Sequence, residues 1–206
     1  MMDILGVILA GGLATRMGGG DKSLLQLGGR SILSHVIDRI EPQVAGLALN
    51  ANGDATRFDR FGLPVISDSI DGFAGPLAGV LSGLDWAAAR GASHVVSVAA
   101  DTPFFPADLV PQLRLAAELK GVEVALAASP HPKKGVLRQP TFGLWPVALR
   151  DDLRAALNDG VRKVVIWTEK HNASEAVFPV FRIDPFFNVN TPEDLEKAAA
   201  MMGGNT

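Results

Sequence analysis

Short apolar runs alternate along the chain with segments in which apolar residues recur at helical spacing. The first run, Ile4–Leu9, is apolar at nearly every position, which is typical of a strand that is covered on both faces. Strands that alternate with helices indicate an α/β fold with a mainly parallel sheet. We expect further strands at residues 44–49, 64–66, 94–100, 122–128, 141–145 and 177–183.

The helices are predicted from the same pattern and from their end signals. Ser31 is a suitable N-cap for a helix that runs to Ile40, because apolar residues follow it at helical spacing. Thr191 and Pro192 open the last helix with an N-cap and a proline at the first position, and two acidic residues follow. We expect further helices at residues 54–61, 77–90, 107–119 and 147–157, loops at 10–29, 69–76 and 129–138, and a frayed end at 203–206.

The composition suits one globular domain. The chain has 206 residues, of which 48% are hydrophobic, enough to bury a full core. It contains no cysteine, which excludes disulfides, thiolate metal sites and cysteine nucleophiles. No basic segment precedes the first apolar run, and no apolar stretch approaches the about 20 residues of a membrane helix. We therefore expect a soluble, cytoplasmic protein that does not bind membranes.

The charge pattern argues against nucleic acid as a partner. The formal net charge is −3, and no basic stripe runs along the chain. The dense basic positions are Lys133 and Lys134 with Arg138, and Arg162 with Lys163. These residues stand beside glycine or proline in expected loops, where they can bind a small anionic ligand.

Polar or glycine-rich positions follow four expected strands in succession. The first strand ends in a glycine-rich loop, and the next three end at Asn50, Asp68 and Asp101. In an open α/β sheet, ligands bind beyond the carboxyl ends of the strands, at a topological switch point. We therefore expect these positions to meet at one edge of the sheet and to form a ligand site.

The loop after the first strand has the features of a phosphate-binding segment. Gly11 and Gly12, like the glycines at 18–20, allow close backbone approach, so that amide N–H groups can face phosphate oxygens. Arg16 and Lys22 supply the positive charge that holds a polyphosphate and stabilises departing pyrophosphate. The simpler alternative is a flexible, solvated loop with two ordinary surface cations. Because the loop directly follows a buried strand and carries these two cations, we favour the phosphate site.

Two other kinds of phosphate loop fail on spacing. A Walker A motif needs glycine immediately before its lysine and five positions earlier, but Asp21 and Met17 stand there. The dinucleotide fingerprint G-x-G-x-x-G is also missing, because the run that begins at Gly18 ends in Ser23. A P-loop NTPase and a dehydrogenase are therefore disfavoured.

Asp101 is the expected metal ligand. It follows a central apolar strand and precedes Thr102, so its carboxylate can hold Mg²⁺ against a nucleotide phosphate. Nucleotidyl transfer by in-line attack at an α-phosphorus depends mainly on positioning and charge neutralisation. The alternative interpretation is that Asp101 only caps a turn. We expect Mg²⁺ as the cofactor, with Lys22, Arg16 and Asp101 as the catalytic residues.

Several further positions are candidates for the same site. Asn50 and Asp68 can hydrogen-bond a ribose or a base, although each can equally form an Asx turn at a strand end. Asn188 and Asn190 alternate by two and point the same way if their segment is extended, although Asn190 can also serve as a helix-entry cap. Gly75, Pro76 and Leu77 open a helix and can admit a flat base, or can simply reflect packing at the helix start.

At this point the chain resembles a known family, the molybdenum cofactor guanylyltransferases, which attach GMP to molybdopterin. The resemblance covers nearly the whole chain, with the motifs in order and at similar spacing. The matching motifs are Leu9-Ala10-Gly11-Gly12, Arg16-Met17-Gly18-Gly19, Asp21-Lys22, Asn50-Ala51-Asn52, Asp68-Ser69, Gly75-Pro76-Leu77-Ala78-Gly79, Asp101-Thr102-Pro103, Gln139-Pro140-Thr141 and Asn188-Val189-Asn190-Thr191-Pro192.

The resemblance implies a three-layer, Rossmann-like nucleotidyltransferase fold in a single domain, residues 1–206. Residues 1–128 would form the nucleotide-binding half and residues 129–206 the acceptor-binding half. The activity would be GMP transfer from GTP to the phosphate of molybdopterin, with release of pyrophosphate. By the same likeness, the nucleotide would contact Leu9, Ala10, Gly11, Gly12, Lys22, Asn50, Asp68, Gly75, Pro76, Leu77 and Asp101, and the acceptor would contact Asn188, Asn190, Arg138, Gln139, Arg162 and Lys163. Molybdenum-insertion proteins, apo-molybdoenzymes and their chaperones are further expected partners.

The choice of base depends on one position. Related cytidylyltransferases and sugar-1-phosphate nucleotidyltransferases resemble this loop but read Leu-Ala-Ala-Gly, whereas Gly11 here removes a Cβ from the path of a purine. One methyl group discriminates between substrates only modestly. A cytidylyl- or uridylyltransferase with another phosphorylated acceptor therefore stays an alternative. A second alternative, of a different class, is a non-catalytic nucleotide-binding regulator or delivery chaperone.

Overall fold

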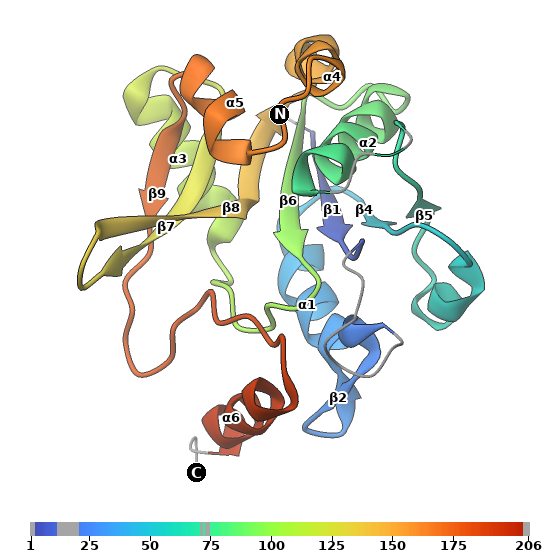
Figure 1. Ribbon diagram of the computed structural model, residues 1–206, viewed down its shortest axis with the longest axis vertical. Helices are drawn as coiled ribbons and strands as arrows, with labels where there is room; N and C mark the ends of the chain where they lie inside the picture. Colours follow the sequence, from blue (N-terminus) through green and yellow to red (C-terminus); the bar gives the residue numbers. More distant parts are fainter. Residues whose placement is uncertain (1–2, 12–20, 71, 73–74, 204–206) are drawn as a thin grey trace.

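A central sheet organises the computed structural model, which describes residues 3–11, 21–70, 72 and 75–203 (Figure 1). In these residues the sheet has seven strands in the order β5-β4-β1-β6-β8-β7-β9. A separate short hairpin consists of β2 and β3. The strands are β1 (Ile4–Leu9), β2 (Gln26–Leu27), β3 (Arg30–Ser31), β4 (Leu47–Asn50), β5 (Val65–Ile66), β6 (His94–Ala99), β7 (Ala125–His131), β8 (Gly135–Pro146) and β9 (Ser174–Val177).

The sheet is mainly parallel, and the predicted α/β class is confirmed. β1 pairs in parallel with both β4 and β6, so that Leu9 lies opposite Asn50 on one side and Ala99 on the other. β8 runs antiparallel to β6 and β7. The chain therefore builds outward from β1 through β4 and β5, then crosses to β6 on the other side of β1, which makes this a topological switch point.

Helices cover both faces of the sheet (Figure 1). α1 and α3 pack on one face, against side chains such as Ile8 and Val98, and α2, α4 and α5 pack on the other, against Val7 and Val95. The helices are α1 (Ile32–Ile40), α2 (Pro76–Ala88), α3 (Leu109–Lys120), α4 (Arg150–Asn158), α5 (Val164–Lys170) and α6 (Pro192–Gly203), with 3₁₀ turns η1 (Lys22–Leu24), η2 (Glu41–Gln43), η3 (Ala55–Phe61) and η4 (Val147–Leu149).

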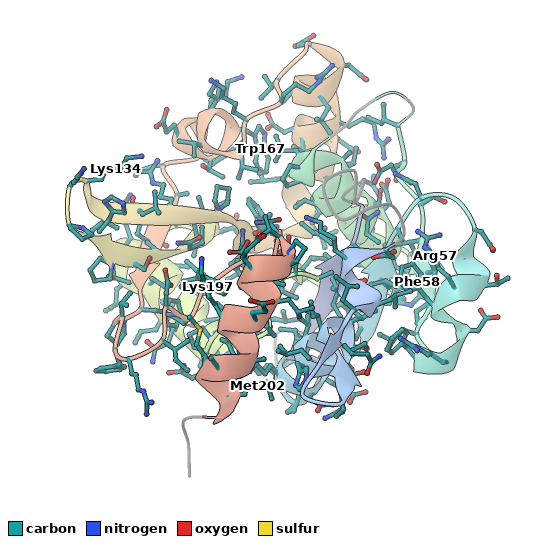
Figure 2. The ribbon with its side chains drawn as sticks, turned by 60° about the horizontal axis from the view of Figure 1, so that its bottom comes forward. Arg57, Phe58, Lys134, Trp167, Lys197 and Met202 are labelled. Atoms are coloured by element: carbon teal, nitrogen blue, oxygen red, sulfur yellow. The ribbon has the colours of Figure 1, made fainter. Side chains whose placement is uncertain are left out.

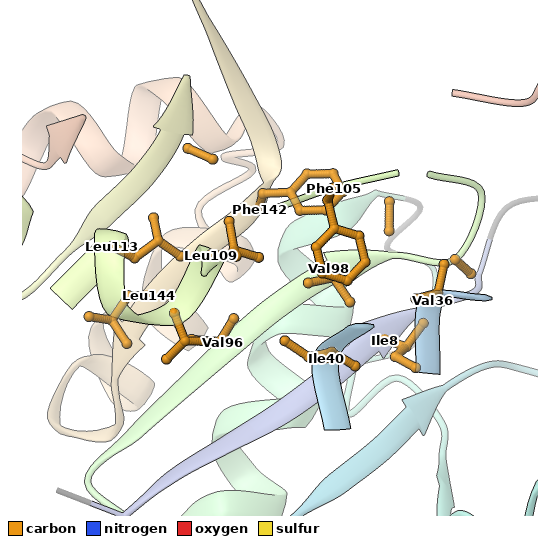
Figure 3. Packing of buried hydrophobic residues seen from close by; sticks show 14 of the residues in the cluster. Ile8, Val36, Ile40, Val96, Val98, Phe105, Leu109, Leu113, Phe142 and Leu144 are labelled. Atoms are coloured by element: carbon orange, nitrogen blue, oxygen red, sulfur yellow. The ribbon is translucent and has the colours of Figure 1, made fainter. Parts of the chain in front are cut away.

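Figure 3 shows the core between the sheet and the helices α1 and α3. Ile8, Val96 and Val98 point from the strands toward Val36 of α1 and Leu109 of α3. All of these side chains are fully or almost fully buried. Each buried aliphatic side chain of this kind stabilises the fold by about 1.5–3 kcal/mol relative to its exposed state. The core therefore holds the strands, and hence their ends, in a fixed arrangement.

Most predicted helices are confirmed, with boundaries shifted by one to three residues. Ser31 caps α1 as expected, because its hydroxyl accepts a hydrogen bond from the backbone N–H of Ser34. Thr191 likewise accepts from the N–H of Asp194 at the start of α6. The expected helix at 54–61 is a 3₁₀ turn capped by Asp54. None of the helices in the described part of the chain is long and apolar enough to cross a membrane.

The predicted loop at 129–138 is wrong. Residues on both sides of a short turn extend β7 and β8 into a hairpin, with Ser129 opposite Leu137. Gly135 adopts a positive φ of 72° after the turn, and the His131 ring accepts N–H bonds from Lys133 and Lys134. The polar composition of the segment reflects an exposed hairpin, not the absence of strand pairing.

The predicted strand at 177–183 is also wrong except at its first residue. β9 is Ser174–Val177, and its last ladder bond runs from the Phe178 N–H to the Ala128 carbonyl. Pro179 has no N–H to continue the ladder, so the strand ends there. The short helix α5, which buries Val164 and Trp167, was not predicted.

The predicted loop at 10–29 contains more structure than expected. η1 covers Lys22–Leu24, and the β2–β3 hairpin turns at Gly28 and Gly29, both with positive φ. α6 approaches this hairpin, since a Cβ added at Gly28 would lie 3.1 Å from the Met202 side chain. The helix α6 therefore packs beside the β2–β3 hairpin.

Candidate functional site

The ends of β5, β4, β1 and β6 lie side by side, as the sequence predicts. Backbone hydrogen bonds continue to the last residues of these strands. The Ala10 N–H donates to the Asn50 carbonyl (2.9 Å), the Ala51 N–H to Ile66 (3.0 Å) and the Ala100 N–H to Leu9 (3.1 Å). The segments that leave the four strands therefore start from one rigid edge.

A cluster of polar and charged groups lies where β6 ends. Lys22 Nζ donates to Asn190 Oδ1 at 2.8 Å and lies 3.7 Å from Asp101 Oδ2. The Lys22 and Asp101 side chains are 19% and 25% exposed, so both charges reach solvent at the sheet edge. The structure thus brings together three predicted site residues from distant parts of the sequence.

Thr102 connects Asp101 to the segment before α6. Its hydroxyl lies 2.7 Å from Asn188 Oδ1 and 3.1 Å from Asp101 Oδ1, and it is completely buried. The Val189 N–H donates to the Asp101 carbonyl at 2.9 Å. Asn188 and Asn190 therefore face the same edge on either side of buried Val189, as their spacing of two predicts.

Asp194 fixes the backbone of this segment. Its carboxylate accepts from the N–H groups of Asn190 (3.2 Å) and Thr191 (3.1 Å). Burial raises the pKa of Asp194, but the hydrogen bonds from Asn190 and Thr191 outweigh this and keep the pKa below the ordinary value of 3.8. The carboxylate therefore stays charged near neutral pH, at the positive end of the α6 dipole.

A second polar group lies at the ends of β4 and β5. Asn50, only 4% exposed, donates through Nδ2 to Asp68 Oδ1 at 3.0 Å. Asn52 Nδ2 donates to Asp68 Oδ2 at 2.8 Å, and the Asp68 N–H donates back to Asn52 Oδ1 at 2.9 Å. Both carboxylate oxygens of Asp68 are thus oriented by amide donors, which leaves further lone pairs for a ligand.

The start of α2 packs closely behind Asn50. A Cβ added at Gly79 would lie 2.4 Å from Asn50 Oδ1, so a larger residue there would have to displace the Asn50 side chain. Gly75 has a φ of 143° and Pro76 is the first residue of α2. Leu77 is 1% exposed within the core, so a ligand could reach only its backbone.

Gly11 lies at the exposed exit of β1. Among the described residues, a Cβ added there would have one neighbour within 4 Å, Asn50 Oδ1 at 4.0 Å. The predicted site residues Gly12 and Arg16 lie outside the described residues.

The expected acceptor residues are less closely grouped. Because β8 is antiparallel to β6, its first residues, including Arg138 and Gln139, extend beyond the carboxyl end of β6. Arg138 pairs with Glu175 (2.6 Å) and Glu169 (3.4 Å), so its charge is directed toward β9 and α5.

Gln139, Arg162 and Lys163 occupy different surroundings. Gln139 donates to the Ser129 hydroxyl at 3.2 Å. Arg162 lies closer to the nucleotide side, since its carbonyl is 3.9 Å from a Cβ added at Gly75. Lys163 is exposed at the start of α5.

Three residues were not among the predicted site residues. Thr102 and Asn52 stand inside sequence motifs that include Asp101 and Asn50, so the motifs themselves were a usable signal. Arg57, on η3, forms an ion pair with Asp21 next to Lys22. No spacing in the sequence distinguishes Arg57 from Arg60 of the same turn.

Comparisons with known proteins agree with this geometry. The model of a family described as the MobA-like NTP transferase domain matches residues 6–173. A molybdenum cofactor guanylyltransferase of a Bradyrhizobium species is 51% identical over 202 residues, covering 95% of this chain and 93% of that protein. One from Mesorhizobium japonicum is 49% identical over 209 residues, covering 99% and 98%. The crystal structure of the molybdopterin-guanine dinucleotide biosynthesis protein A of Archaeoglobus fulgidus shares the fold, with a TM-score of 0.71 at 22% identity over 97% of this chain and 99% of that one.

The fold and the family match define a nucleotidyltransferase. The chain belongs to the molybdenum cofactor guanylyltransferases, within the MobA-like NTP transferases. The family resemblance that the sequence motifs carry is therefore confirmed, as is the prediction that the chain is an enzyme.

Proposed function

We propose that the edge of the sheet transfers GMP from GTP to the phosphate of molybdopterin and releases pyrophosphate. The observation that carries this proposal is the contact of Lys22 with Asn190 and Asp101 at the switch point between β1 and β6. The names of the 51% and 49% identical relatives support guanine as the base and the molybdenum cofactor as the product.

The proposed nucleotide site spans the two polar groups at the strand ends. The backbone of Leu9, Ala10, Gly11 and Gly12, with Arg16 and Lys22, would hold the triphosphate. Asn50 and Asp68 would hydrogen-bond the guanosine, whose base would lie against the backbone of Gly75, Pro76 and Leu77. The oriented Asp68 carboxylate supports this, because acceptor oxygens suit the N–H groups of a guanine edge.

Mg²⁺ fits the residues at the end of β6. Mg²⁺ binds through one or two carboxylates and completes its shell with water and substrate phosphates. Asp101 supplies one partly exposed carboxylate 3.7 Å from the Lys22 ammonium. Among the described residues no group of three or more histidine, aspartate or glutamate side chains could hold a metal by itself, so the substrate would complete the shell. When bound, the ion would neutralise charge on the phosphates.

The chain's own residues would act mainly by positioning. An oxygen of the acceptor phosphate would attack the α-phosphorus in line, and the bond to the departing pyrophosphate would break. A phosphate nucleophile is already ionised, so no side chain needs to act as a strong base. Lys22 would stabilise negative charge as it develops on the departing pyrophosphate.

The acceptor would lie on the side of residues 129–206, with residues 1–128 as the nucleotide-binding half. Asn188 and Asn190 would border both substrates, because they contact Thr102 and Lys22. Arg138, Gln139, Arg162 and Lys163 would contact the phosphate and pterin of the acceptor. The enzyme would act in the cytoplasm, where molybdenum-insertion proteins and apo-molybdoenzymes or their chaperones would be its partners.

Single substitutions at Lys22 and Asp101 test the proposed chemistry. Lys22→Ala and Asp101→Asn should each lower kcat/KM by about 100- to 1000-fold, because each removes a charge that acts on the transferring phosphate. Asp101→Asn should also raise the Mg²⁺ concentration needed for half-maximal turnover. Both are measured as pyrophosphate release with GTP and molybdopterin.

Asp108→Asn is the matched control, since Asp108 is an exposed carboxylate between β6 and α3. It should behave like the wild type. Turnover by Asp101→Asn with an unchanged Mg²⁺ requirement would contradict the metal role of Asp101. Stabilisation of the folded protein by CTP and not by GTP would contradict the choice of base.

A further inference from the structure

Arg57 makes contacts with two different segments of the site. Its Nε lies 3.2 Å from Asp21 Oδ2, and its Nη2 donates to the Asn52 carbonyl at 2.8 Å. Its Nη1 donates to the Asp54 carbonyl. The guanidinium carbon is 4.4 Å from the centre of the Phe58 ring. Figure 2 shows Arg57 and Phe58 together on η3, on the opposite side of the view from Lys134 at the tip of the β7–β8 hairpin.

The two segments that Arg57 joins carry the two halves of the nucleotide site. Asp21 immediately precedes Lys22, whose ammonium contacts Asn190 and Asp101. Asn52 orients the Asp68 carboxylate through two hydrogen bonds. One guanidinium thus connects the phosphate side of the site to the base side.

Asp21 is held from two directions. Its Oδ1 accepts from the Ser23 N–H at 3.2 Å and from the Ser23 hydroxyl at 2.7 Å, which caps η1. Its Oδ2 is the atom that meets Arg57, and the Asp21 side chain is only 13% exposed. Because Lys22 is the next residue, a shift of Asp21 moves the start of the lysine side chain.

The chemistry of this contact calls for arginine. A guanidinium offers five N–H donors in a rigid, planar fork, and here the fork meets one carboxylate and two carbonyls. A lysine ammonium is a single point charge and cannot reach three such acceptors in these directions. The Arg57 side chain is 29% exposed, so the ion pair with Asp21 is partly shielded from solvent.

We propose that Arg57 is a positioning residue that fixes Lys22 relative to the Asn52–Asp68 group, so that triphosphate and base are held at the correct separation. This inference relies on the proposed roles of Lys22 and Asp68. Arg57 itself need not touch either substrate. Its loss should therefore weaken the use of GTP without changing the acceptor site.

Steady-state kinetics of pyrophosphate release, with GTP and molybdopterin varied separately, test the inference. Arg57→Ala should lower kcat/KM for GTP by about 10- to 100-fold, since small misplacements of a binding group cost that much. The GTP KM should rise, whereas the molybdopterin KM should stay unchanged. Arg57→Lys should recover part of the loss. A merely structural role would lower the active fraction and leave both KM values as they are.

Asp21→Asn gives an independent test through the ion pair. The amide keeps the Oδ1 cap on Ser23 but removes the charge that Arg57 meets. If the two residues act as one unit, the double variant Asp21→Asn with Arg57→Ala should have the same kcat/KM for GTP as the more impaired of the two single variants. Effects that add would overturn the proposal. This cycle can also be built with Arg57→Lys, should Arg57→Ala fail to fold.

Arg60→Ala is the matched control. Arg60 lies on the same turn and stacks over Phe61 at 4.8 Å, but it makes no ion pair within the described residues. It should behave like the wild type, and Arg57→Ala behaving like Arg60→Ala would overturn the proposal. Lys22→Ala, run in parallel, separates the two hypotheses: an active Lys22→Ala enzyme contradicts the proposed function, whereas an inactive one with a normal Arg57→Ala enzyme contradicts the positioning role alone.

Discussion

Asn50 connects the core of the fold to the site. Its side chain is 4% exposed and donates both to the Ile66 carbonyl (3.2 Å) and to Asp68 (3.0 Å). Gly79 packs against it from α2, so close that a methyl group would lie 2.4 Å from its Oδ1. The orientation of Asp68 thus depends on the absence of one methyl group on a neighbouring helix.

Gly79→Ala should damage the site more than the fold. Alanine favours the helix by about 1 kcal/mol, but its Cβ must displace Asn50 Oδ1 and Leu9 Cδ2, the latter 2.8 Å away. We expect kcat/KM for GTP to fall about tenfold or more as Asp68 loses the hydrogen bond from Asn50. Pyrophosphate release and urea unfolding measure the two effects.

Gly83→Ala provides the comparison on the same helix. Its Cβ would meet Val7 Cγ1 at 2.9 Å, which is core packing away from Asn50. Overpacking of a core costs about 1–3 kcal/mol, so this variant should lose stability and keep its GTP KM. A Gly79→Ala enzyme with a wild-type GTP KM would refute the link between Gly79 and the orientation of Asp68.

The sequence predicted individual residues where the geometry of a parallel sheet determines their place. Asn50, Asp68 and Asp101 end strands whose carboxyl ends share an edge, so their convergence follows from chain order alone. The pairing of Lys22 with Asn190 joins positions 168 residues apart, and no local pattern specifies it. Arg57 was missed for the same reason, because its role depends on which side of η3 faces Asp21.

At the scale of elements, apolar periodicity predicts the long helices and strands correctly. Polar composition, by contrast, predicts a loop where short exposed strand ends lie. The buried strands β1 and β6 and the helices α1 and α2 stand where their apolar patterns predict them. The polar composition of residues 129–138 predicts a loop where β7 and β8 form a hairpin, because exposed strand ends carry the polar residues that loops also carry. The helix α5 has seven residues, too few for a periodic signal.

The start of α6 is the element that fixes the asparagines of the site. Asp194→Ala should lower the free energy of unfolding by about 1 kcal/mol, because the N–H groups of Asn190 and Thr191 lose their acceptor. The same change frees the backbone of Asn190, so turnover should fall as well. Urea unfolding and pyrophosphate release are the measurements.

Glu196→Ala serves as the control for this helix, since Glu196 is exposed one turn from the helix start. Neither its stability nor its turnover should change. If Asp194→Ala lost stability but kept full turnover, α6 would not position Asn190 for catalysis.

At the scale of the whole molecule, the site is assembled from both halves of the chain. The strands β1, β4, β5 and β6 provide the sheet edge, whereas Asn188 and Asn190 return from beyond β9 to lie against Thr102 and Lys22. Figure 1 shows this return, in which the segment after β9 passes below the sheet to reach α6. Unfolding of the sheet or of the segment before α6 should therefore abolish the site. A change that weakens the sheet far from this edge should lower activity only by lowering the fraction of folded protein.

His94 offers a way to weaken the sheet without touching the site. It begins β6, at the opposite end of the strand from Asp101, and is 6% exposed, with Nδ1 3.0 Å from the Ser93 hydroxyl. Burial lowers the pKa of His94 below its ordinary value of 6.5, and the nearby positive charge of Arg114 lowers it further, against the opposing effect of Glu123.

The lowered pKa of His94 makes the folded protein less stable at acidic pH. Well above pH 6.5 His94 is neutral in both the folded and the unfolded chain, so its contribution to stability is complete. As the pH falls below 6.5, the unfolded chain takes up the proton first, and stability decreases until the folded pKa is passed. One proton limits this loss to about 1.4 kcal/mol per pH unit.

The wild type should thus lose more stability than His94→Gln between about pH 7.5 and about pH 5.5 in urea unfolding. An equal loss in His94→Gln would show that other groups set the acid sensitivity.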